Sequence, residues 1–342
     1  MQCVNQMIMA RVSNVKSGWK NIFSVITSGA RDTHQSLVES AFAVVRRVMG
    51  HFALITEITD TIDECINCLV AFGRNTQFTD ISLQAIEYLL KCAHHLGALG
   101  RAGGGEDRGS GGGGEGSGGG EVATTSSPAK PPASSGQQGG GGDGSLKVWF
   151  LLLTGLSGMV SDPRLEVRSR ALQVLFNTLH SYGNDFKPAT WRLIFQGVLF
   201  PIFDDVRHGD NSDFGGSGAT AAGMSKHAFG PSWLQTTCLA ALNTLVELFS
   251  RFFHIVSFLL PELLQLVNSC IQGGSLHLAE IGVKAWVTLL GSAGHKFGDR
   301  EWAVFLRALA SAFDEALPYE LVSAKVRAPP PSPTIPSPFV RF

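Results

Sequence analysis

The chain has 342 residues, of which 44% are hydrophobic and 16% are charged, as in an ordinary globular protein. Its formal net charge is -1, so bulk charge gives no drive toward nucleic acid or an acidic membrane, both of which need clustered positive charge. We therefore expect no nucleic-acid partner.

The N-terminal 99 residues predict helical repeats. Apolar residues recur every three or four positions over 12–26 and again from about residue 35 to 48, with a turn at 28–32 between them. A second pair follows, over 61–72 and 80–99. Helix, turn and helix therefore alternate through 1–99.

Residues 100–144 interrupt this pattern, because they hold 19 of the chain's 40 glycines and no aromatic residue. Such a segment cannot bury enough apolar surface to offset the entropy of ordering it. A phosphate-binding glycine loop would need a preceding strand and a following helix, and a P-loop would also end in Lys-Ser or Lys-Thr. We expect 100–144 to be a disordered linker.

Helical repeats resume over 145–318, beginning with a helix at 146–160 and a helix pair at 163–206. Asp162 suits the N-cap of this pair, and Pro163 suits the first turn, where its missing N–H costs nothing. Tyr182-Gly183-Asn184-Asp185 is expected to end the first helix, because glycine and asparagine tolerate the left-handed conformation of a C-terminal cap. Trp191 lies on the apolar face of the second helix.

The remaining segments complete an all-α chain. We expect a mobile loop at 207–231, helices at 233–253, 276–290 and 300–317, and a segment at 255–271 that Pro261 either kinks or splits. A disordered, proline-rich tail covers 319–342. No run has the alternating pattern of a strand. The predicted fold is an armadillo/HEAT-like α-solenoid of stacked helix pairs, with the glycine-rich insertion and the tail.

Motifs that could carry chemistry have simpler structural interpretations. Cys65 and Cys68 have C-x-x-C spacing, but they lie in one amphipathic helix without further zinc ligands, which favours core packing. Adjacent residues on a helix diverge by about 100°, so His94-His95 suits capping or surface exposure, and Asp204-Asp205 suits a cap and a solvated charge. We expect no catalytic residue, metal site or cofactor.

Two further features concern charge and location. The charged cluster of Asp162, Glu166, Arg168 and Arg170 is interpreted as an inter-repeat salt bridge or a solvated ridge, with a partner contact as the alternative. Six cysteines scattered through apolar stretches favour a reducing compartment. No secretory signal opens the sequence, and the apolar stretches at 148–160 and 252–261 are too short to span a membrane. We therefore expect no transmembrane segment.

Several blocks resemble one known family. They are DPRLEVRSRALQVLF from Asp162, YG from Tyr182, WRLIF from Trp191, PIFD from Pro201, VKSGWKNIFSV from Val15 and WLQTTCLAAL from Trp233. In order and spacing they resemble the helical region downstream of the catalytic domain in the large, brefeldin-A-inhibited guanine-nucleotide exchange factors for Arf GTPases. The long glycine insertion departs from that pattern.

The resemblance implies a non-catalytic regulatory or scaffolding region that acts in Golgi and endosomal vesicle trafficking. In that family a separate catalytic domain performs exchange, and this sequence resembles a C-terminal piece without it. The expected partners are an Arf-family GTPase or other trafficking proteins, and the expected location is the cytoplasm, peripheral to Golgi, trans-Golgi or endosomal membranes. The signature residues are expected to be structural: Trp19, Asp162, Arg168, Trp191, Pro201, Phe203 and Asp204.

Two alternatives stay open. An armadillo-type adaptor such as a nuclear-transport carrier would bind a peptide in the concave face of a solenoid. Carriers of that kind line the groove with tryptophans, and the six tryptophans of this chain recur at intervals in its later part. Large aromatic residues also fill the cores between helices. An enzyme without a recognisable motif is the other alternative.

Overall fold

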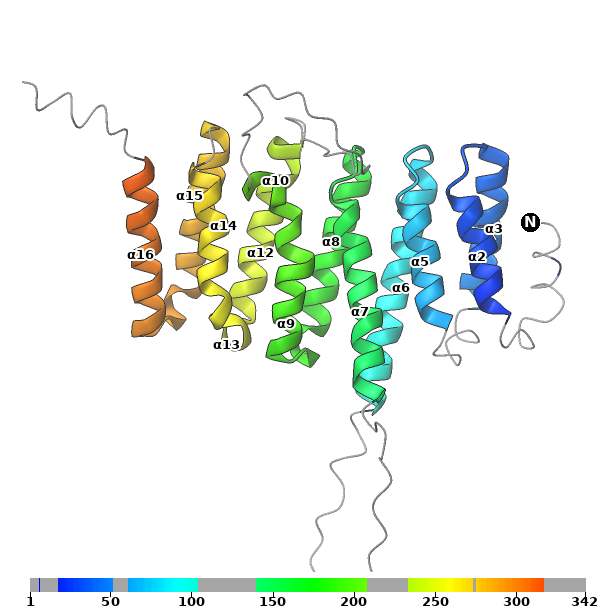
Figure 1. Cartoon of the computed structure of the whole chain (residues 1–342), viewed down its shortest axis with the longest axis horizontal. Coiled ribbons are helices and arrows are strands. Elements are labelled where there is room, and N and C mark those ends of the chain that lie inside the picture. The colour runs from blue at the N-terminus through cyan, green and yellow to red at the C-terminus, as the bar shows by residue number, and fades with distance from the viewer. Residues whose placement is uncertain are drawn as a thin grey trace, which may run out of the picture.

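The computed structural model describes residues 6, 18–51, 61–103, 140–207, 233–272 and 275–316. All regular structure in these ranges is helical, which confirms the prediction of an all-α chain. The helices stand side by side in chain order along the long axis of the molecule, from α2 at one end to α16 at the other (Figure 1).

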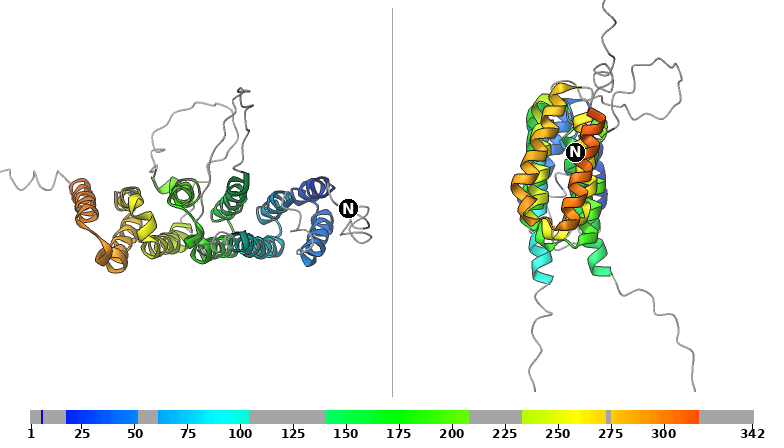
Figure 2. Two further views of the ribbon diagram at one scale, coloured as in Figure 1. Left: turned by 90° about the horizontal axis from the view of Figure 1, so that it is seen from below. Right: turned by 90° about the vertical axis from the view of Figure 1, so that its left-hand side faces the viewer.

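The helices form two rows, which the left view of Figure 2 shows end-on. Each row is a chain of contacts between helices from successive pairs. The first row contains α2 (Trp19–Ala30), α5 (Ile62–Gly73), α7 (Gly140–Met159), α9 (Pro188–Ile194) with α10 (Asp204–Arg207), α14 (Leu260–Gln272) and α16 (Asp299–Ala316). The second row contains α3 (Gln35–Gly50), α6 (Thr79–Gly103), α8 (Leu165–Tyr182), α12 (Leu239–Arg251) and α15 (Leu276–Ala293).

Short elements adjust the path of the chain between these helices. Two are π-helical, four are 3₁₀-helical, and α13 is a single α-helical turn. The π-helical elements are η4 (Phe195–Leu199) and η6 (Leu234–Cys238), the 3₁₀ elements are η3 (Gly183–Asp185), η5 (Phe200–Phe203), η7 (Ser257–Leu259) and η8 (Gly294–Lys296), and α13 covers Phe253–Val256.

Two helices run into the expected linker. α6 ends at Gly103 and α7 begins at Gly140, so both extend a few residues past the predicted limits of 99 and 145. Once a helix is nucleated, each further residue adds a backbone hydrogen bond at small cost, which lets helices continue into glycine-rich sequence. The rest of the linker lies outside the described residues, as do most of the loop predicted at 207–231 and the tail from 319.

The segment predicted at 255–271 is split near Pro261, which is one of the two predicted outcomes. α13 ends at Val256, a 3₁₀ turn follows, and α14 begins at Leu260. Proline is therefore the second residue of α14, where its missing N–H would have no intrahelical partner in any case.

The predicted cap of α8 is wrong. α8 begins at Leu165, and the extended residue Arg164 occupies the N-cap position. The Oδ1 of Asp162 accepts a 2.9 Å hydrogen bond from the backbone N–H of Arg164, and its carboxylate also binds the Arg164 guanidinium. Asp162 therefore shapes the turn before the helix, and Pro163 lies in that turn.

α8 ends at Tyr182, as predicted, but Gly183 does not have the left-handed conformation of a glycine cap. Gly183 has φ -62° and ψ -24°, which is right-handed, and the chain continues there into η3. Glycine is required for space instead, because a Cβ would lie 2.6 Å from both Trp191 Cζ2 and Phe252 Cζ. The Trp191 Nε1 donates a 3.0 Å hydrogen bond to the Gly183 carbonyl, which holds the indole over this glycine.

One continuous hydrophobic core runs between the rows from Trp19 to Phe305. Aromatic rings link successive pairs within it: the Trp191 ring centroid lies 5.8 Å from that of Phe186 and 4.9 Å from that of Phe252. Cys65 and Cys68 are buried in the same core, which confirms the structural interpretation of the C-x-x-C spacing.

Candidate functional site

Three of the turns that join first-row to second-row helices share one construction. The turns after α2, α5 and α7 all lie along the upper edge of the molecule in Figure 1. In each, the Oδ1 atom of an Asp or Asn accepts a hydrogen bond from the backbone N–H two residues later, a local bond typical of these side chains. The pairs are Asp32 with His34 at 2.8 Å, Asn75 with Gln77 at 2.9 Å, and Asp162 with Arg164 at 2.9 Å.

The first two of these turns also repeat in sequence. Arg-Asp-Thr-His begins at Arg31, and Arg-Asn-Thr-Gln begins at Arg74, which is 43 residues further along. Each arginine is the C-cap of its first-row helix, α2 or α5. The sequence interpretation missed this repeat. A search for self-similarity at a period of about 40 residues, the usual length of two-helix repeats, could have found it.

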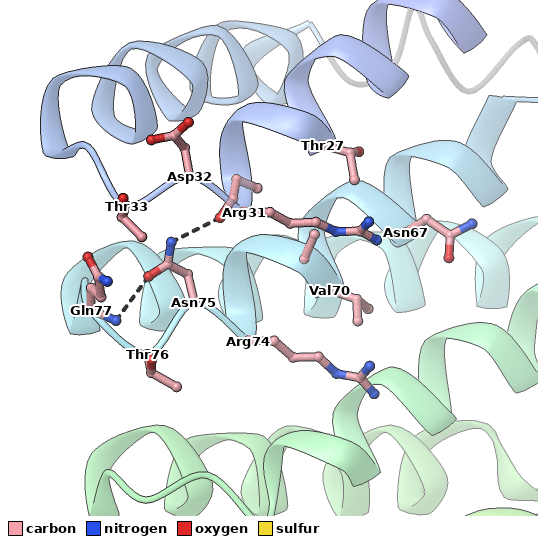
Figure 3. A pocket seen from close by; sticks show the side chains of 12 residues that line it. Thr27, Arg31, Asp32, Thr33, Asn67, Val70, Arg74, Asn75, Thr76 and Gln77 are labelled. Carbon is pink, nitrogen blue, oxygen red and sulfur yellow. Dashed lines mark hydrogen bonds between the residues drawn. The ribbon is translucent and has the colours of Figure 1, made fainter. Parts of the chain in front are cut away.

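A groove of about 510 Å³ lies between the ends of α2 and α5. Its lining is mostly polar, and it includes the side chains of both repeated arginines (Figure 3). The lining includes Thr27, Arg31, Asn67, Val70, Arg74 and Asn75.

The groove is held open by contacts of defined geometry. The Asn75 Nδ2 donates a 2.9 Å hydrogen bond to the Ala30 carbonyl, and so ties the turn after α5 to the end of α2. On the other side, the Arg74 guanidinium lies directly over Gly158 of α7, where even a methyl group would collide with it. The absence of a side chain at Gly158 gives Arg74 room to extend.

The electrostatics of the groove are positive. In Figure 3, Arg31 and Arg74 extend in the same direction, whereas the Asp32 carboxylate points the other way. Asp32 Oδ1 is engaged by His34, whose Nδ1 lies 2.8 Å away. Hydrogen bonds from the backbone and then the side chain of His34 lower the pKa of Asp32. Among the residues that the structure describes, no carboxylate forms a salt bridge with Arg31 or Arg74.

A second groove, of about 530 Å³, separates α14 from α16. Here too an asparagine joins neighbouring first-row helices, because Asn268 Nδ2 donates a 2.9 Å hydrogen bond to the Ala308 carbonyl. Arg307 is the one charged residue in this lining. The second groove therefore has less positive charge than the first.

The predicted signature residues are not gathered at either groove. Four lie in separate parts of the interior: Trp19, Trp191 and Phe203 in the core, and Arg168 between α8 and η6. Asp162 is also buried, whereas Pro201 and Asp204 are exposed. Their proposed structural role stays a prediction.

Arg168 joins segments far apart in the sequence. Its Nε donates to Thr237 Oγ1 at 2.8 Å, its Nη2 donates to Thr236 Oγ1 at 3.0 Å, and its Nη1 donates to the Pro163 carbonyl at 2.9 Å. A guanidinium that is 3% exposed needs such acceptors, because burial without them is costly. Arg168 thus fastens η6 to the start of α8.

The rest of the charged cluster also makes contacts between helices. Arg170 of α8 forms an ion pair with Glu87 of α6, and this hydrogen bond raises the pKa of Arg170. This agrees with the interpretation of the cluster as an inter-repeat salt bridge.

The two histidines of α6 lie inside the helix, which continues to Gly103, so the predicted capping role is wrong, whereas His94 is exposed, as the alternative prediction has it. His94 Nδ1 lies 2.8 Å from the Tyr182 hydroxyl, a contact between α6 and α8. Burial lowers the pKa of its neighbour His95. Within the described ranges no three His, Cys, Asp or Glu side chains are grouped as a metal site would need.

One stretch, Phe253–Gln272, is long and apolar enough to cross a membrane by length and composition. It spans three elements, α13, η7 and α14, and half of its most apolar window is buried inside the protein. A core helix of a globular protein passes the same test, so this stretch is weak evidence for a membrane span.

Comparison with known proteins gives two family matches. Residues 1–47 match the family described as Mon2/Sec7/BIG1-like, HDS, and residues 54–251, more than half of the chain, match the C-terminal region of Mon2 protein. Neither description names a catalytic domain. No solved structure matches.

Individual relatives point the same way. The chain is 37% identical to brefeldin A-inhibited guanine nucleotide-exchange protein 2 of Arabidopsis thaliana over 93% of its length, and 36% identical to protein 3 of the same plant over 93%. It is 26% identical to protein 1 of Homo sapiens over 97% of its length. The chain spans 18% of the plant relatives and 16% of the human one.

Proposed function

Because this chain belongs to the family of the HDS and C-terminal regions of Mon2 and the brefeldin A-inhibited guanine nucleotide-exchange proteins, we propose that it is a non-catalytic regulatory and scaffolding region of a large Arf exchange factor. The observation that carries this proposal is the extent of the family match, which takes in 1–47 and 54–251. The exchange reaction itself would belong to a catalytic domain elsewhere in such a factor.

The architecture supports a scaffolding role. Two rows of helices, each a chain of contacts between successive pairs, are what an armadillo/HEAT-like solenoid would give. In such a stack each pair contacts only its neighbours, which leaves long edges of turns and grooves free for partners. The edge with the Asp and Asn turns is one of these.

The proposed partners are an Arf-family GTPase or other trafficking proteins, at Golgi, trans-Golgi or endosomal membranes. Peripheral association is the simplest form of membrane contact for this chain, since half of the most apolar window of Phe253–Gln272 is buried inside the protein.

A nuclear-transport carrier gains no support from the tryptophans. Five of the six are at most 7% exposed, so they fill the core between helices and do not line a groove. Only Trp302, at 38%, reaches the surface.

The test is a nucleotide-release assay on a purified Arf GTPase loaded with fluorescent GDP. We expect the chain alone to leave the release rate at its spontaneous value, and to bind the GTPase or the exchange domain of a relative in a sedimentation assay. Faster release by the chain alone would overturn the non-catalytic assignment. Binding to a nuclear-localisation peptide, with none to the GTPase or the exchange domain, would favour the carrier.

A further inference from the structure

We infer that the groove between α2 and α5 binds an extended acidic segment of a partner protein, with Arg31 and Arg74 pairing with its carboxylates. This deepens the proposed function, and rests on it for the expectation that the region binds a partner. The groove also lies where the two matched family regions meet, since α2 belongs to 1–47 and α5 to 54–251.

The charge of the groove is the first argument. Two exposed guanidinium groups line one cavity of about 510 Å³, and no described carboxylate forms a salt bridge with either. Arginine presents a planar fork of donors that matches a carboxylate, so two of them in one groove favour a ligand with more than one acidic group.

A simpler role for these arginines is to complement the negative ends of the α2 and α5 dipoles, since both are C-caps. That role needs each guanidinium to lie near the last carbonyls of its own helix. Instead both extend away from the turns, and Arg74 reaches across to Gly158 of α7. The dipoles of α2 and α5 therefore account for arginine at these positions but not for the shared direction of the side chains.

The remaining lining suits a peptide backbone. Asn67 and Thr27 lie near the Arg31 guanidinium and offer amide and hydroxyl groups, which pair with backbone N–H and C=O groups as well as with side chains. Val70 lies between the two arginines and supplies an apolar floor. A lining with two guanidinium groups, an amide, a hydroxyl and an apolar floor therefore suits an extended segment whose backbone and acidic side chains both find partners.

The same groove is a poor membrane site. Recognition of anionic lipid surfaces uses clusters of about four to eight basic residues, whereas this lining has two. Lys20, near the start of α2, is not part of this lining, and its charge is partly neutralised because its Nζ lies 3.9 Å from Glu64 Oε1.

The experiment is a selection of twelve-residue random peptides on the full chain, followed by fluorescence anisotropy on the recovered peptides. Its central variant is the double charge reversal R31E/R74E, with R300E as the control because Arg300 is exposed on α16, far from the groove. Circular dichroism checks that each variant keeps its helices. Vesicles of phosphatidylcholine with phosphatidylserine test the membrane alternative.

We expect the recovered peptides to carry two or more Asp or Glu residues, to bind more weakly as salt rises, and to lose at least about tenfold in affinity for R31E/R74E but not for R300E. Four outcomes would each overturn the inference: recovered peptides that are neutral or basic, equal binding of the peptides to the double variant, no enrichment of any peptide, or binding to the vesicles in place of peptides.

If acidic peptides bind as expected but the chain has no effect on exchange and no affinity for Arf or the exchange domain, the proposed function is overturned and the inference about the groove stands. If the chain alters exchange, or binds Arf or the exchange domain, but no acidic peptide binds the groove, only the inference about the groove is overturned.

Discussion

The side-chain Nδ2 of Asn75 donates a 2.9 Å hydrogen bond to the backbone carbonyl of Ala30, 45 residues earlier in the chain. Ala30 is the last residue of α2, and the final carbonyls of a helix have no donor within it. The Oδ1 of the same asparagine accepts from the Gln77 N–H. One amide therefore shapes its own turn and ties it to the preceding helix pair.

Replacing Asn75 with alanine should lower the free energy of unfolding by about 1–2 kcal/mol, because the Ala30 carbonyl and the Gln77 N–H both lose a partner. Urea unfolding followed by circular dichroism measures this. Asn67→Ala is the matched control, since Asn67 lines the same groove on its exposed side and should change stability by less than about 0.5 kcal/mol. Equal losses in the two variants would contradict the role given to the Asn75 bond.

Two glycines of α6 should respond to alanine in opposite directions. A Cβ at Gly97 would collide with the Tyr182 ring, which is held by His94 and packs on Trp149. We expect Gly97→Ala to destabilise the protein by about 1–3 kcal/mol. Gly100 has no atom within 4 Å of its Cβ position, so Gly100→Ala should be neutral or stabilise by up to about 1 kcal/mol. Thermal unfolding measures the stability of the two variants, and destabilisation of similar size in both would refute the packing argument.

Trp191→Ala should cost on the order of 3 kcal/mol, because the side chain is fully buried and its loss leaves a cavity between helix pairs. The indole N–H also donates to Gly183. Trp302→Ala is the comparison, since Trp302 is 38% exposed and should cost less. A melting temperature unchanged by Trp191→Ala would place this residue outside the core.

The buried thiols should be unreactive in the folded chain. Burial raises the pKa of Cys68, Cys238 and Cys270 to about 12, and raises that of Cys65, where a hydrogen bond with Cys92 is the larger cause. Thiol reagents attack the thiolate, so a Cys3→Ser variant, which removes the cysteine outside the described residues, should react slowly at pH 8 and rapidly in urea.

The same pKa shifts predict a loss of stability in alkali. The unfolded thiols ionise from about pH 8.5, whereas the folded ones stay neutral up to about pH 12. Their contribution to stability is therefore complete below about pH 8.5 and is lost as pH rises toward 12. Fast labelling of the native protein at pH 8 would contradict the burial of these thiols.

Much of the fold could be predicted because the apolar periodicity of each helix is local in sequence. The helix at 35–50 and the break near Pro261 follow from spacing and from the missing proline N–H alone. The turns were predicted less well. Asp162 and Gly183 have the right residue types for caps, but their observed roles depend on Arg164, Trp191 and Phe252, which only the packed structure brings near.

The groove could not be predicted at all from local patterns. Arg31 and Arg74 are each ordinary residues at a helix end, and they form one site only because α2 and α5 are neighbours in the first row. The repeated Arg-Asx-Thr sequence was the available signal, and its meaning depends on the stacking of the pairs.

The measurement that most directly tests the central claim is the rate of nucleotide release from an Arf GTPase, catalysed by the isolated exchange domain of a plant relative, with and without this chain. We predict no acceleration by the chain alone, and a change in the rate of the exchange domain when the chain is added. Acceleration by the chain alone, or a rate of the exchange domain that no concentration of the chain alters, would contradict the assignment of a non-catalytic regulatory region.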